Sequence, residues 1–270
     1  MSKEQEKFLI FGNPIEHSKS PQMHNSAFEH LNLNCFYEKY LLLDGKKLKE
    51  IFNLQNAKGA NITVPHKENA FKLADEVVGI ANEIEAVNTY VKRDDKIYAY
   101  NTDAPGFMKA IKDFGKLKSV LILGAGGTAK AIAMALKEEN IEVRVLNRSA
   151  EKLEFFKAHG FKTYTWGNFQ MNHYDLIVNS TSAGLKDDEY PLKKTTLESI
   201  FLNAKYAFDC VYGKNTPFLK LAKEEGLKAK DGEDMLLYQG VLAFELFTDT
   251  KLDNETIEIM RQALKKEEEE

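Results

Sequence analysis

The sequence predicts an α/β protein with two domains. Short apolar runs alternate with amphipathic segments along most of the 270 residues, a pattern typical of strands separated by covering helices. A chain of this length suits one large domain or two modest ones. A cluster of glycines directly follows one apolar run near residue 124, and it indicates a strand–turn–helix unit at the start of a second domain.

Seven apolar runs predict strands and six amphipathic segments predict helices. The strands are expected at Phe8–Phe11, Phe36–Leu43, Asn61–Val64, Val120–Leu123, Val143–Leu146, Leu176–Val178 and Ala207–Val211. The helices are expected at Pro21–Leu31, Lys46–Asn53, Ala104–Phe114, Thr128–Glu139, Ala150–Ala158 and Pro217–Glu225. Asp94-Asp95 separates Thr89–Lys92 from Lys96–Tyr100, which indicates a hairpin, and the chain from Met235 onward is expected to be helical.

The composition excludes several classes of protein. Hydrophobic residues make up 43% and charged residues 29% of the chain, which excludes a disordered chain, a collagen and a disulfide scaffold. The net charge of −4 disfavours a nucleic-acid partner, because proteins that bind the polyphosphate backbone are usually basic. No apolar run is long enough to span a membrane, and the two cysteines, Cys35 and Cys210, fit a reducing cytosol. These observations favour a cytoplasmic protein that binds neither nucleic acid nor a membrane.

The glycine cluster is a dinucleotide-binding fingerprint. The residues Gly124, Ala125, Gly126, Gly127, Thr128 and Ala129 follow the Val120–Leu123 strand and open a helix, in the GxGxxA version of the motif. Gly124 permits the tight turn, Gly126 lets the backbone approach the pyrophosphate, and Ala129 keeps the helix close to the sheet. The pyrophosphate is expected at the helix N-terminus, where backbone N–H groups and the helix dipole favour an anion.

The end of the next strand predicts which dinucleotide binds. NAD sites place an acidic residue here to bond the ribose 2′-hydroxyl, whereas this sequence places Asn147 and Arg148, with Lys152 in the following helix. A guanidinium suits a 2′-phosphate through its charge and its fork of donors. The predicted cofactor is therefore NADP(H), and the predicted chemistry is hydride transfer.

Polar side chains follow the first strand where a packed core would not need them. Ser18 and Ser20 lie two residues apart and suit a polyhydroxylated ligand, although Ser20 before Pro21 is also a typical helix N-cap. Asn61 and Thr63 share one face of the third predicted strand. They form either part of a binding site or the wet face of an edge strand.

Four further polar positions point to the same site. Lys67 comes just past the end of the third predicted strand, and Asn88 and Asp103 flank the hairpin. Asp103 either faces the site or simply opens the helix that follows. Gln239 lies in a nearly unbroken apolar helix, so its amide needs partners, either on another helix or on a ligand.

The histidines predict no metal site. His17, His24, His30 and His66 lack the spacing of zinc and facial-triad motifs, and we expect them to be surface or capping residues.

Nine stretches, in one order and nearly end to end, resemble the shikimate dehydrogenase family of NADP-dependent enzymes, which reduce 3-dehydroshikimate to shikimate. The stretches are GNPIEHSKSPQMHN, ANITVPHK, AVNT, NTDAPG, GAGGTAKA, NRS, NSTSAG, DCVYGKNTPFL and DGEDMLLYQGVLAFE. The resemblance implies a Rossmann-type NADP domain at residues 104–234. It also implies an α/β substrate domain at residues 1–103, completed by helices at 235–270.

The resemblance also implies roles for individual residues. Lys67 and Asp103 become the catalytic pair, which polarises the substrate carbonyl and delivers a proton. Substrate contacts are implied for Ser18, Ser20, Asn61, Thr63, Lys67, Asn88, Asp103, Tyr212 and Gln239. Contacts with NADP(H) are implied for Gly124, Ala125, Gly126, Gly127, Thr128, Ala129, Asn147, Arg148, Lys152, Thr181, Val211 and Gly232.

The sequence departs from the family pattern at three positions. Glu85 stands where glycine is common, and Lys130 and Lys152 stand where arginine is common. A lysine keeps the positive charge of arginine but loses its planar fork of donors, which weakens phosphate binding.

Two other functions compete with this interpretation. One is a quinate/shikimate dehydrogenase with a broader substrate range or NAD use, and Arg148 without an acidic neighbour argues against NAD. The other is a non-catalytic NADP-binding sensor on the same fold. A sensor has no need of a proton-transfer pair, so the presence of both Lys67 and Asp103 argues against it.

Overall fold

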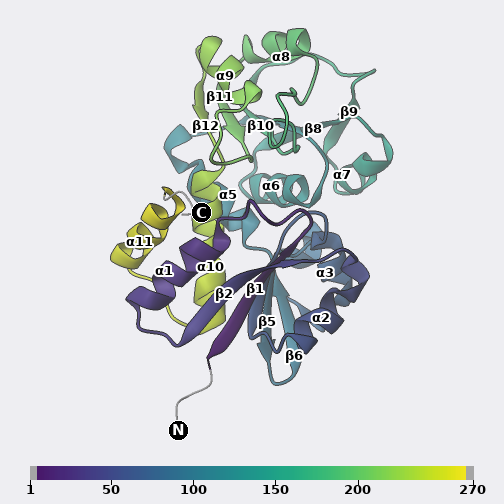
Figure 1. The fold of residues 1–270 in the computed structure, drawn as a ribbon. Helices are drawn as coiled ribbons and strands as arrows, with labels where there is room; N and C mark the ends of the chain where they lie inside the picture. Colours follow the sequence, from purple (N-terminus) through teal and green to yellow (C-terminus); the bar gives the residue numbers. More distant parts are fainter. Residues whose placement is uncertain (1–4, 266–270) are drawn as a thin grey trace. The chain divides into compact units, whose positions relative to one another are not determined.

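The computed structural model describes residues 5–265, and these residues fall into two compact units. The first unit comprises residues 5–106 and 236–265, and the second comprises residues 107–235. Each unit has its own sheet covered by helices (Figure 1). The predicted α/β fold class is confirmed.

The described residues of the first unit form a mixed six-stranded sheet in the order β2-β1-β3-β5-β6-β4. Its strands are β1 (Glu6–Gly12), β2 (Cys35–Leu41), β3 (Gly59–Ile62), β4 (Glu76–Val77), β5 (Thr89–Arg93) and β6 (Lys96–Tyr100). β5 pairs antiparallel with both β3 and β6, whereas the other pairs are parallel. The predicted hairpin is confirmed as β5–β6, and it makes this sheet mixed rather than wholly parallel.

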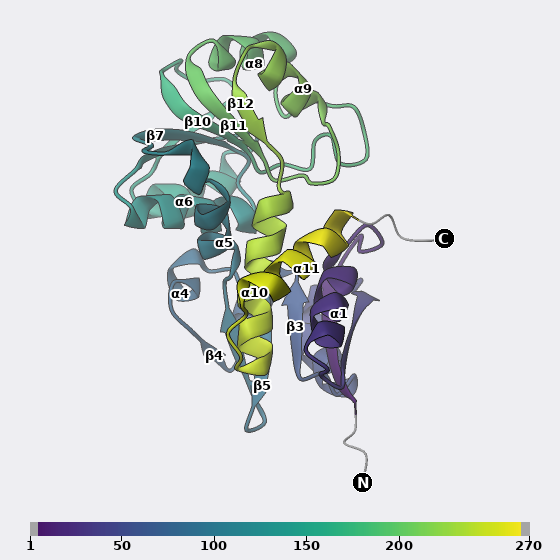
Figure 2. The ribbon, with the colours of Figure 1, turned by 90° about the vertical axis from the view of Figure 1, so that its left-hand side faces the viewer.

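Helices cover both faces of the first sheet, which explains why β1 is apolar along its whole length. Phe8 and Ile10 of β1 pack with the first set of helices, and Leu9 and Phe11 pack with the second set. The first set, seen together in Figure 2, is α1 (Ser20–His30), α10 (Glu233–Thr248) and α11 (Asn254–Lys265). The second set is α2 (Leu48–Leu54), α3 (Lys67–Leu73) and α4 (Ala81–Ile84), preceded by the 3₁₀ turn η1 (Gly45–Lys47). The C-terminal helices therefore complete the first unit.

The described residues of the second unit form a parallel six-stranded sheet in the order β12-β11-β10-β7-β8-β9. Its strands are β7 (Ser119–Leu123), β8 (Glu142–Asn147), β9 (Lys162–Thr165), β10 (Tyr174–Asn179), β11 (Ala204–Asp209) and β12 (Lys228–Lys230). The helices around it are α6 (Gly127–Glu138), α7 (Glu154–Ala158), α8 (Lys194–Phe201) and α9 (Pro217–Glu224), with η2 (Lys112–Phe114) and η3 (Glu151–Leu153). The remaining helix, α5 (Asp103–Ala110), precedes η2 in the chain.

The strand order of the second unit reverses direction between β7 and β10. In doubly wound sheets of this kind, ligands bind outside the carboxyl ends of the strands at that reversal. Gly124 follows β7 and Ser180 follows β10, and their backbones approach closely there, since a Cβ added to Gly124 would lie 3.3 Å from Ser180 C and Ser180 N–H donates to Leu123 O at 2.9 Å. The topology therefore places the fingerprint turn at the expected ligand position.

Several element boundaries differ from the predictions. The Asn61–Val64 run stops being a strand after Ile62, because the chain turns there with His66 N–H donating to Thr63 O (3.0 Å). The predicted helix Ala104–Phe114 divides into α5 and η2. The short strands β4, β9 and β12 and the short helices α3 and α4 carry too little apolar periodicity to be predicted. Helix α8 was also missed, although Leu197, Ile200 and Phe201 form one buried face at helical spacing.

Two histidines predicted at the surface or at helix caps are buried instead. His24 is fully buried with its ring stacked 4.4 Å from that of Tyr37, and neither ring nitrogen has a hydrogen-bond partner among the described residues. Burial lowers the pKa of His24 to about 3, so the imidazole is neutral. His66 is buried with Nε2 2.7 Å from Leu42 O. The prediction was wrong for His24, whose ring fills space between packed elements. His66 does occupy the N-cap position of α3, but its side chain is buried and makes no capping hydrogen bond.

Candidate active site

A lysine and an aspartate form a buried ion pair in the first unit. Lys67 is the first residue of α3 and Asp103 is the first residue of α5. Lys67 Nζ donates to Asp103 Oδ2 at 2.5 Å, and the two residues are only 9% and 5% exposed. A buried pair of charges is costly to assemble unless further hydrogen bonds satisfy it. Such a pair can hold a proton at a defined place, which is what general acid–base chemistry requires.

Asn88 supplies the further hydrogen bonds. Its Nδ2 donates to Asp103 Oδ1 and to Thr102 Oγ1, both at 2.9 Å, and its Oδ1 accepts from Thr102 N–H at 2.8 Å. The side chain that caps α5 is Asn101, whose Oδ1 accepts from Ala104 N–H (3.2 Å). Asp103 therefore does not serve as the cap, and its carboxylate is held by Lys67 and Asn88.

Asn61 belongs to the same buried network. Its strand, β3, lies between β1 and β5, so the edge-strand interpretation is wrong. Asn61 Oδ1 accepts from the Tyr37 hydroxyl at 2.7 Å, and Nδ2 donates to Asn88 O at 3.2 Å and to Thr89 Oγ1 at 3.1 Å. Tyr37 was not among the predicted site residues, because an aromatic residue in an apolar strand has the pattern of a core residue.

Ser18 and Ser20 are both buried next to this network. Helix α1 starts at Ser20, and no side chain caps it, so the N-cap interpretation of Ser20 is wrong. Ser18 Oγ instead accepts from Ser20 N–H at 3.4 Å. Thr63 is partly buried just past the end of β3.

Gln239 of α10 has its partners in its own helix and in the segment before β5, not on another helix, and its contact with a ligand stays a prediction. It is 8% exposed, its Nε2 donates to Leu236 O at 2.8 Å, and its Oε1 accepts from Asn88 Nδ2 at 3.3 Å. A Cβ added to Gly106 would lie 2.8 Å from Gln239 N, so α10 and the start of α5 are closely packed. The amide therefore bonds within its own unit and also joins Asn88, at the network of the ion pair.

The glycine turn of the second unit has the geometry of an anion site. Gly124 has a φ of +108°, in the region that favours glycine. Gly126 is exposed, and a Cβ added to it would meet no atom within 4 Å. Helix α6 begins at Gly127, and the hydrogen bond from Lys130 N–H to Gly126 O (3.0 Å) closes its first turn. The amides of that turn can meet a phosphate in the open space, so the residues fit a dinucleotide.

The end of β8 presents the residues predicted to select the cofactor. Asn147 closes β8, with Nδ2 donating to Ser149 O at 2.9 Å. Arg148 and Lys152 are both exposed, so their charged groups can reach a 2′-phosphate. Lys130 is placed differently, because it is buried with Nζ 4.5 Å from the centre of the Phe155 ring.

The remaining predicted residues lie beyond the ends of β10, β11 and β12. Thr181 follows β10, and Val211 and Tyr212 follow β11, while Gly232 follows β12. A fully buried carboxylate that the sequence analysis missed, Asp209, lies at the end of β11 among these segments.

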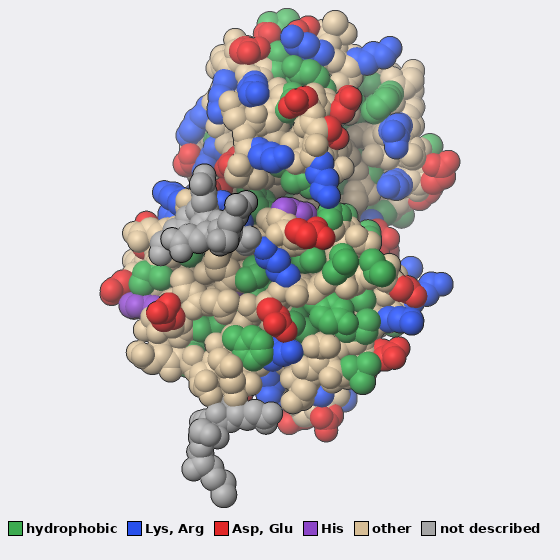
Figure 3. All heavy atoms as spheres, in the orientation of Figure 1, with side chains coloured by type: hydrophobic (Ala, Val, Ile, Leu, Met, Phe, Trp, Pro, Cys, Tyr) green, Lys and Arg blue, Asp and Glu red, His purple; other side chains and the backbone are tan. Residues whose placement is uncertain are grey.

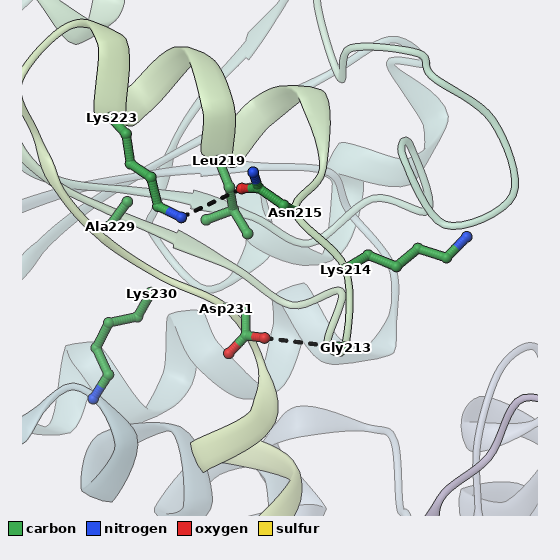
Figure 4. A pocket seen from close by; sticks show the side chains of 8 residues that line it. All are labelled: Gly213, Lys214, Asn215, Leu219, Lys223, Ala229, Lys230 and Asp231. Carbon is green, nitrogen blue, oxygen red and sulfur yellow. Dashed lines mark hydrogen bonds between the residues drawn. The ribbon is translucent and has the colours of Figure 1, made fainter. Parts of the chain in front are cut away.

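A pocket of about 460 Å³ opens beside the N-terminus of α9 (Figure 4). Its lining consists of Gly213, Lys214, Asn215, Leu219, Lys223, Ala229, Lys230 and Asp231. Asp231 accepts from Gly213 N–H (3.3 Å), which joins the segments that carry Gly232 and Tyr212. No predicted site residue lines this pocket.

Three observations bear on other classes of partner. On the face drawn in Figure 3, positive and negative side chains are interspersed, without a broad area of one sign. Among residues 5–265, no group of three or more His, Cys, Asp or Glu residues is arranged to hold a metal ion. No helix in the same range has the length and apolar character needed to cross a bilayer.

Comparisons with known proteins cover nearly the whole chain. Three family models match: the shikimate dehydrogenase substrate binding domain at residues 10–90, shikimate/quinate 5-dehydrogenase at 108–201, and the shikimate 5′-dehydrogenase C-terminal domain at 232–265. The chain is 46% identical to a shikimate dehydrogenase (NADP⁺) of Helicobacter hepaticus, over 95% of this chain and 96% of that protein. A Helicobacter pylori enzyme of the same name is 43% identical over 94% and 97%.

A solved structure shares the fold. The shikimate 5-dehydrogenase of Thermus thermophilus, in complex with NADP(H) and shikimate, is 36% identical, covers 96% of this chain and 99% of its own, and superposes with a TM-score of 0.82. The order of strands in the second unit, the buried lysine–aspartate pair and these likenesses agree, and the chain belongs to the shikimate dehydrogenase family.

Proposed function

We propose that this protein catalyses the reversible, NADP-dependent reduction of 3-dehydroshikimate to shikimate, in the pathway to chorismate and the aromatic amino acids. The observation that carries the proposal is the buried Lys67–Asp103 pair, which Asn88 holds in place. Relatives named for this activity cover almost the full length of the chain at 43–46% identity, which supports it.

The reaction adds a hydride to a ring carbonyl carbon and a proton to its oxygen. When bound, the reduced nicotinamide supplies the hydride. Lys67 polarises the carbonyl through Nζ, Asp103 holds the ammonium or shares its proton, and the pair delivers a proton to the carbonyl oxygen. In the oxidative direction the pair receives the hydroxyl proton instead.

The other predicted residues divide between two roles. The substrate residues Ser18, Ser20, Asn61, Thr63, Asn88 and Gln239 belong to the first unit, with residues 1–103 and 235–270 as the substrate domain. Residues 104–234 are the NADP domain, in which the turn Gly124–Ala129 holds the pyrophosphate and Arg148 meets the 2′-phosphate. In that domain, Thr181, Val211 and Gly232 meet the nicotinamide, and Tyr212 meets the substrate. We place the enzyme in the cytoplasm, as a monomer or homodimer.

The test is a spectrophotometric assay of the purified protein. Shikimate with NADP⁺ should give NADPH absorbance, and Lys67→Ala should remove most of that rate while the variant remains folded. Quinate and NAD⁺ in matched reactions separate a broader quinate/shikimate dehydrogenase from the proposed enzyme. Tight NADPH binding without turnover of either substrate would contradict the proposal and favour a sensor.

A further inference from the structure

One buried carboxylate connects the segments that carry the proposed nicotinamide residues. Asp209 lies at the end of β11 and is fully buried. Its Oδ1 accepts from Asn179 Nδ2 and from Val211 N–H, both at 3.0 Å, and its Oδ2 accepts from Thr216 Oγ1 at 2.5 Å. These partners belong to the end of β10, the segment after β11 and the start of α9.

Each partner of Asp209 fixes one further segment. Asn179 Oδ1 accepts from Thr181 N–H at 3.1 Å and from Thr181 Oγ1 at 2.7 Å. Val211 O accepts from Gly232 N–H at 3.1 Å. These hydrogen bonds connect Asp209, directly or through one neighbour, to residues from three separate parts of the chain, namely Thr181, Val211 and Gly232.

The third partner ties in the start of a helix. Thr216 caps α9, with Oγ1 accepting from Leu219 N–H at 3.2 Å. A Cβ added to Gly184 would lie 2.9 Å from Thr216 Cβ, so the segment after β10 packs against this cap. The carboxylate therefore restrains the loop after β10 from two sides.

Burying the carboxylate of Asp209 costs more free energy than burying an apolar side chain of similar size would. Burial raises the pKa of Asp209 to about 6, while the hydrogen bonds from its three donors act in the opposite direction and favour the carboxylate. Burying a charge is unfavourable unless hydrogen bonds compensate it, and all three of its contacts are donors. An apolar side chain could fill the same space without that cost, but it could not order three segments at once.

We propose that Asp209 is a positioning residue that holds Thr181, Val211 and Gly232 in place around the nicotinamide half of NADP(H). The proposal rests on the proposed function, because the nicotinamide roles of these residues do. Asp209 acts through its neighbours, whereas Arg148 and the glycine turn meet the adenosine and phosphate half of the cofactor.

The test measures the binding of the nicotinamide half of the cofactor separately from that of the adenosine half. Asp209→Asn keeps the size of the side chain, but its amide can no longer accept at both oxygen positions. Calorimetry with NADPH and with adenosine 2′,5′-bisphosphate, which lacks the nicotinamide, should show NADPH binding weakened on the order of tenfold and the bisphosphate unchanged. The fluorescence of bound NADPH should shift toward that of the free cofactor. Arg148→Ala is the matched control, and it should weaken both ligands.

A second pair of variants guards against misfolding of Asp209→Asn. Thr216→Val removes one donor to the carboxylate and should weaken NADPH in the same direction by a smaller factor, whereas Thr216→Ser keeps the hydroxyl and should behave as wild type. Equal weakening of both ligands, or of neither, in Asp209→Asn and Thr216→Val would overturn the proposal. Wild-type protein that binds neither ligand would refute the proposed function as well, and with it this inference.

Discussion

Replacing Asp103 with asparagine should remove most of the catalytic rate. In the wild type, Asp103 Oδ2 accepts from Lys67 Nζ at 2.5 Å and Oδ1 accepts from Asn88 Nδ2 at 2.9 Å. Asparagine offers only one acceptor oxygen. Its Nδ2 must then face either the Lys67 ammonium or the Asn88 amide, both of which are donors, so one of the two bonds is necessarily lost.

The expected fall in kcat follows from the role of the Lys67–Asp103 pair in acid–base catalysis. Loss of general acid–base assistance typically lowers a rate by about 10²–10⁴-fold, so kcat of Asp103→Asn should fall by about a hundredfold or more. Lys67→Ala should give a similar loss, and KM for shikimate should change far less, because the contact matters most in the transition state. The double variant should be little slower than either single variant, since the two residues act as one unit.

The assay is steady-state formation of NADPH from shikimate, with the unfolding transition of each variant measured in parallel. A nearly wild-type kcat in Lys67→Ala, with the fold intact, would refute the assignment of the pair. Additive losses in the double variant would show that the two side chains act separately.

Three further predictions concern other parts of the molecule. Arg148→Ala should raise KM for NADP⁺ by about tenfold to a hundredfold, from a contact of roughly 1.5–3 kcal/mol, while KM for NAD⁺ stays unchanged; equal changes for both cofactors would contradict a contact with the 2′-phosphate. Gln239→Ala should weaken shikimate binding in calorimetry. Because its bond with Asn88 is long (3.3 Å) and neutral, the free energy of unfolding should fall by only about 1 kcal/mol, and a larger loss with normal binding would make Gln239 a purely structural residue. Burial lowers the pKa of His24 to about 3 from 6.5, so the unfolded chain takes up a proton first and the free energy of unfolding should decrease as the pH falls below about 6.5. Denaturant titrations should show this slope reduced in His24→Leu, and an unchanged slope would exclude His24 as its source.

The parts of the fold that could be predicted carry their own local signal. The β7–turn–α6 unit combines an apolar strand, required glycines and a helix start within a few residues, and the Asp94-Asp95 hairpin is bounded by its own turn. Short strands such as β9 and β12 lack such a signal. They are strands because β8 and β11 lie beside them, and that pairing depends on tertiary structure.

The candidate site likewise has features that the sequence predicts and features that depend on tertiary structure. Sequence patterns singled out Asn61, Asp103 and Gln239 as polar side chains out of place, but their structural interpretations depended on partners far along the chain. Asn88 and Gln239, for example, are 151 residues apart and yet hydrogen bonded. That Asn61 lies in a central strand follows from the pairing of β3 with both β1 and β5, which joins segments distant in the chain. No local pattern contains these contacts, and only the resemblance to a family could bring the residues together in advance.

Asp209 shows how a small boundary error can hide a residue of this kind. In a parallel α/β sheet, polar residues at the carboxyl ends of strands are the first candidates for a site. The predicted strand Ala207–Val211 runs two residues past the true end of β11 at Asp209, which places the carboxylate inside a strand instead of at its end. The apolar residue Val211 extends the run although it lies outside β11, where its N–H donates to Asp209 Oδ1 and its C=O accepts from Gly232 N–H. A polar residue that interrupts an apolar run near a carboxyl end is therefore better taken as the end of the strand. Applied to the run that starts at Leu176, the same rule ends β10 at Asn179, the side chain that donates to Asp209.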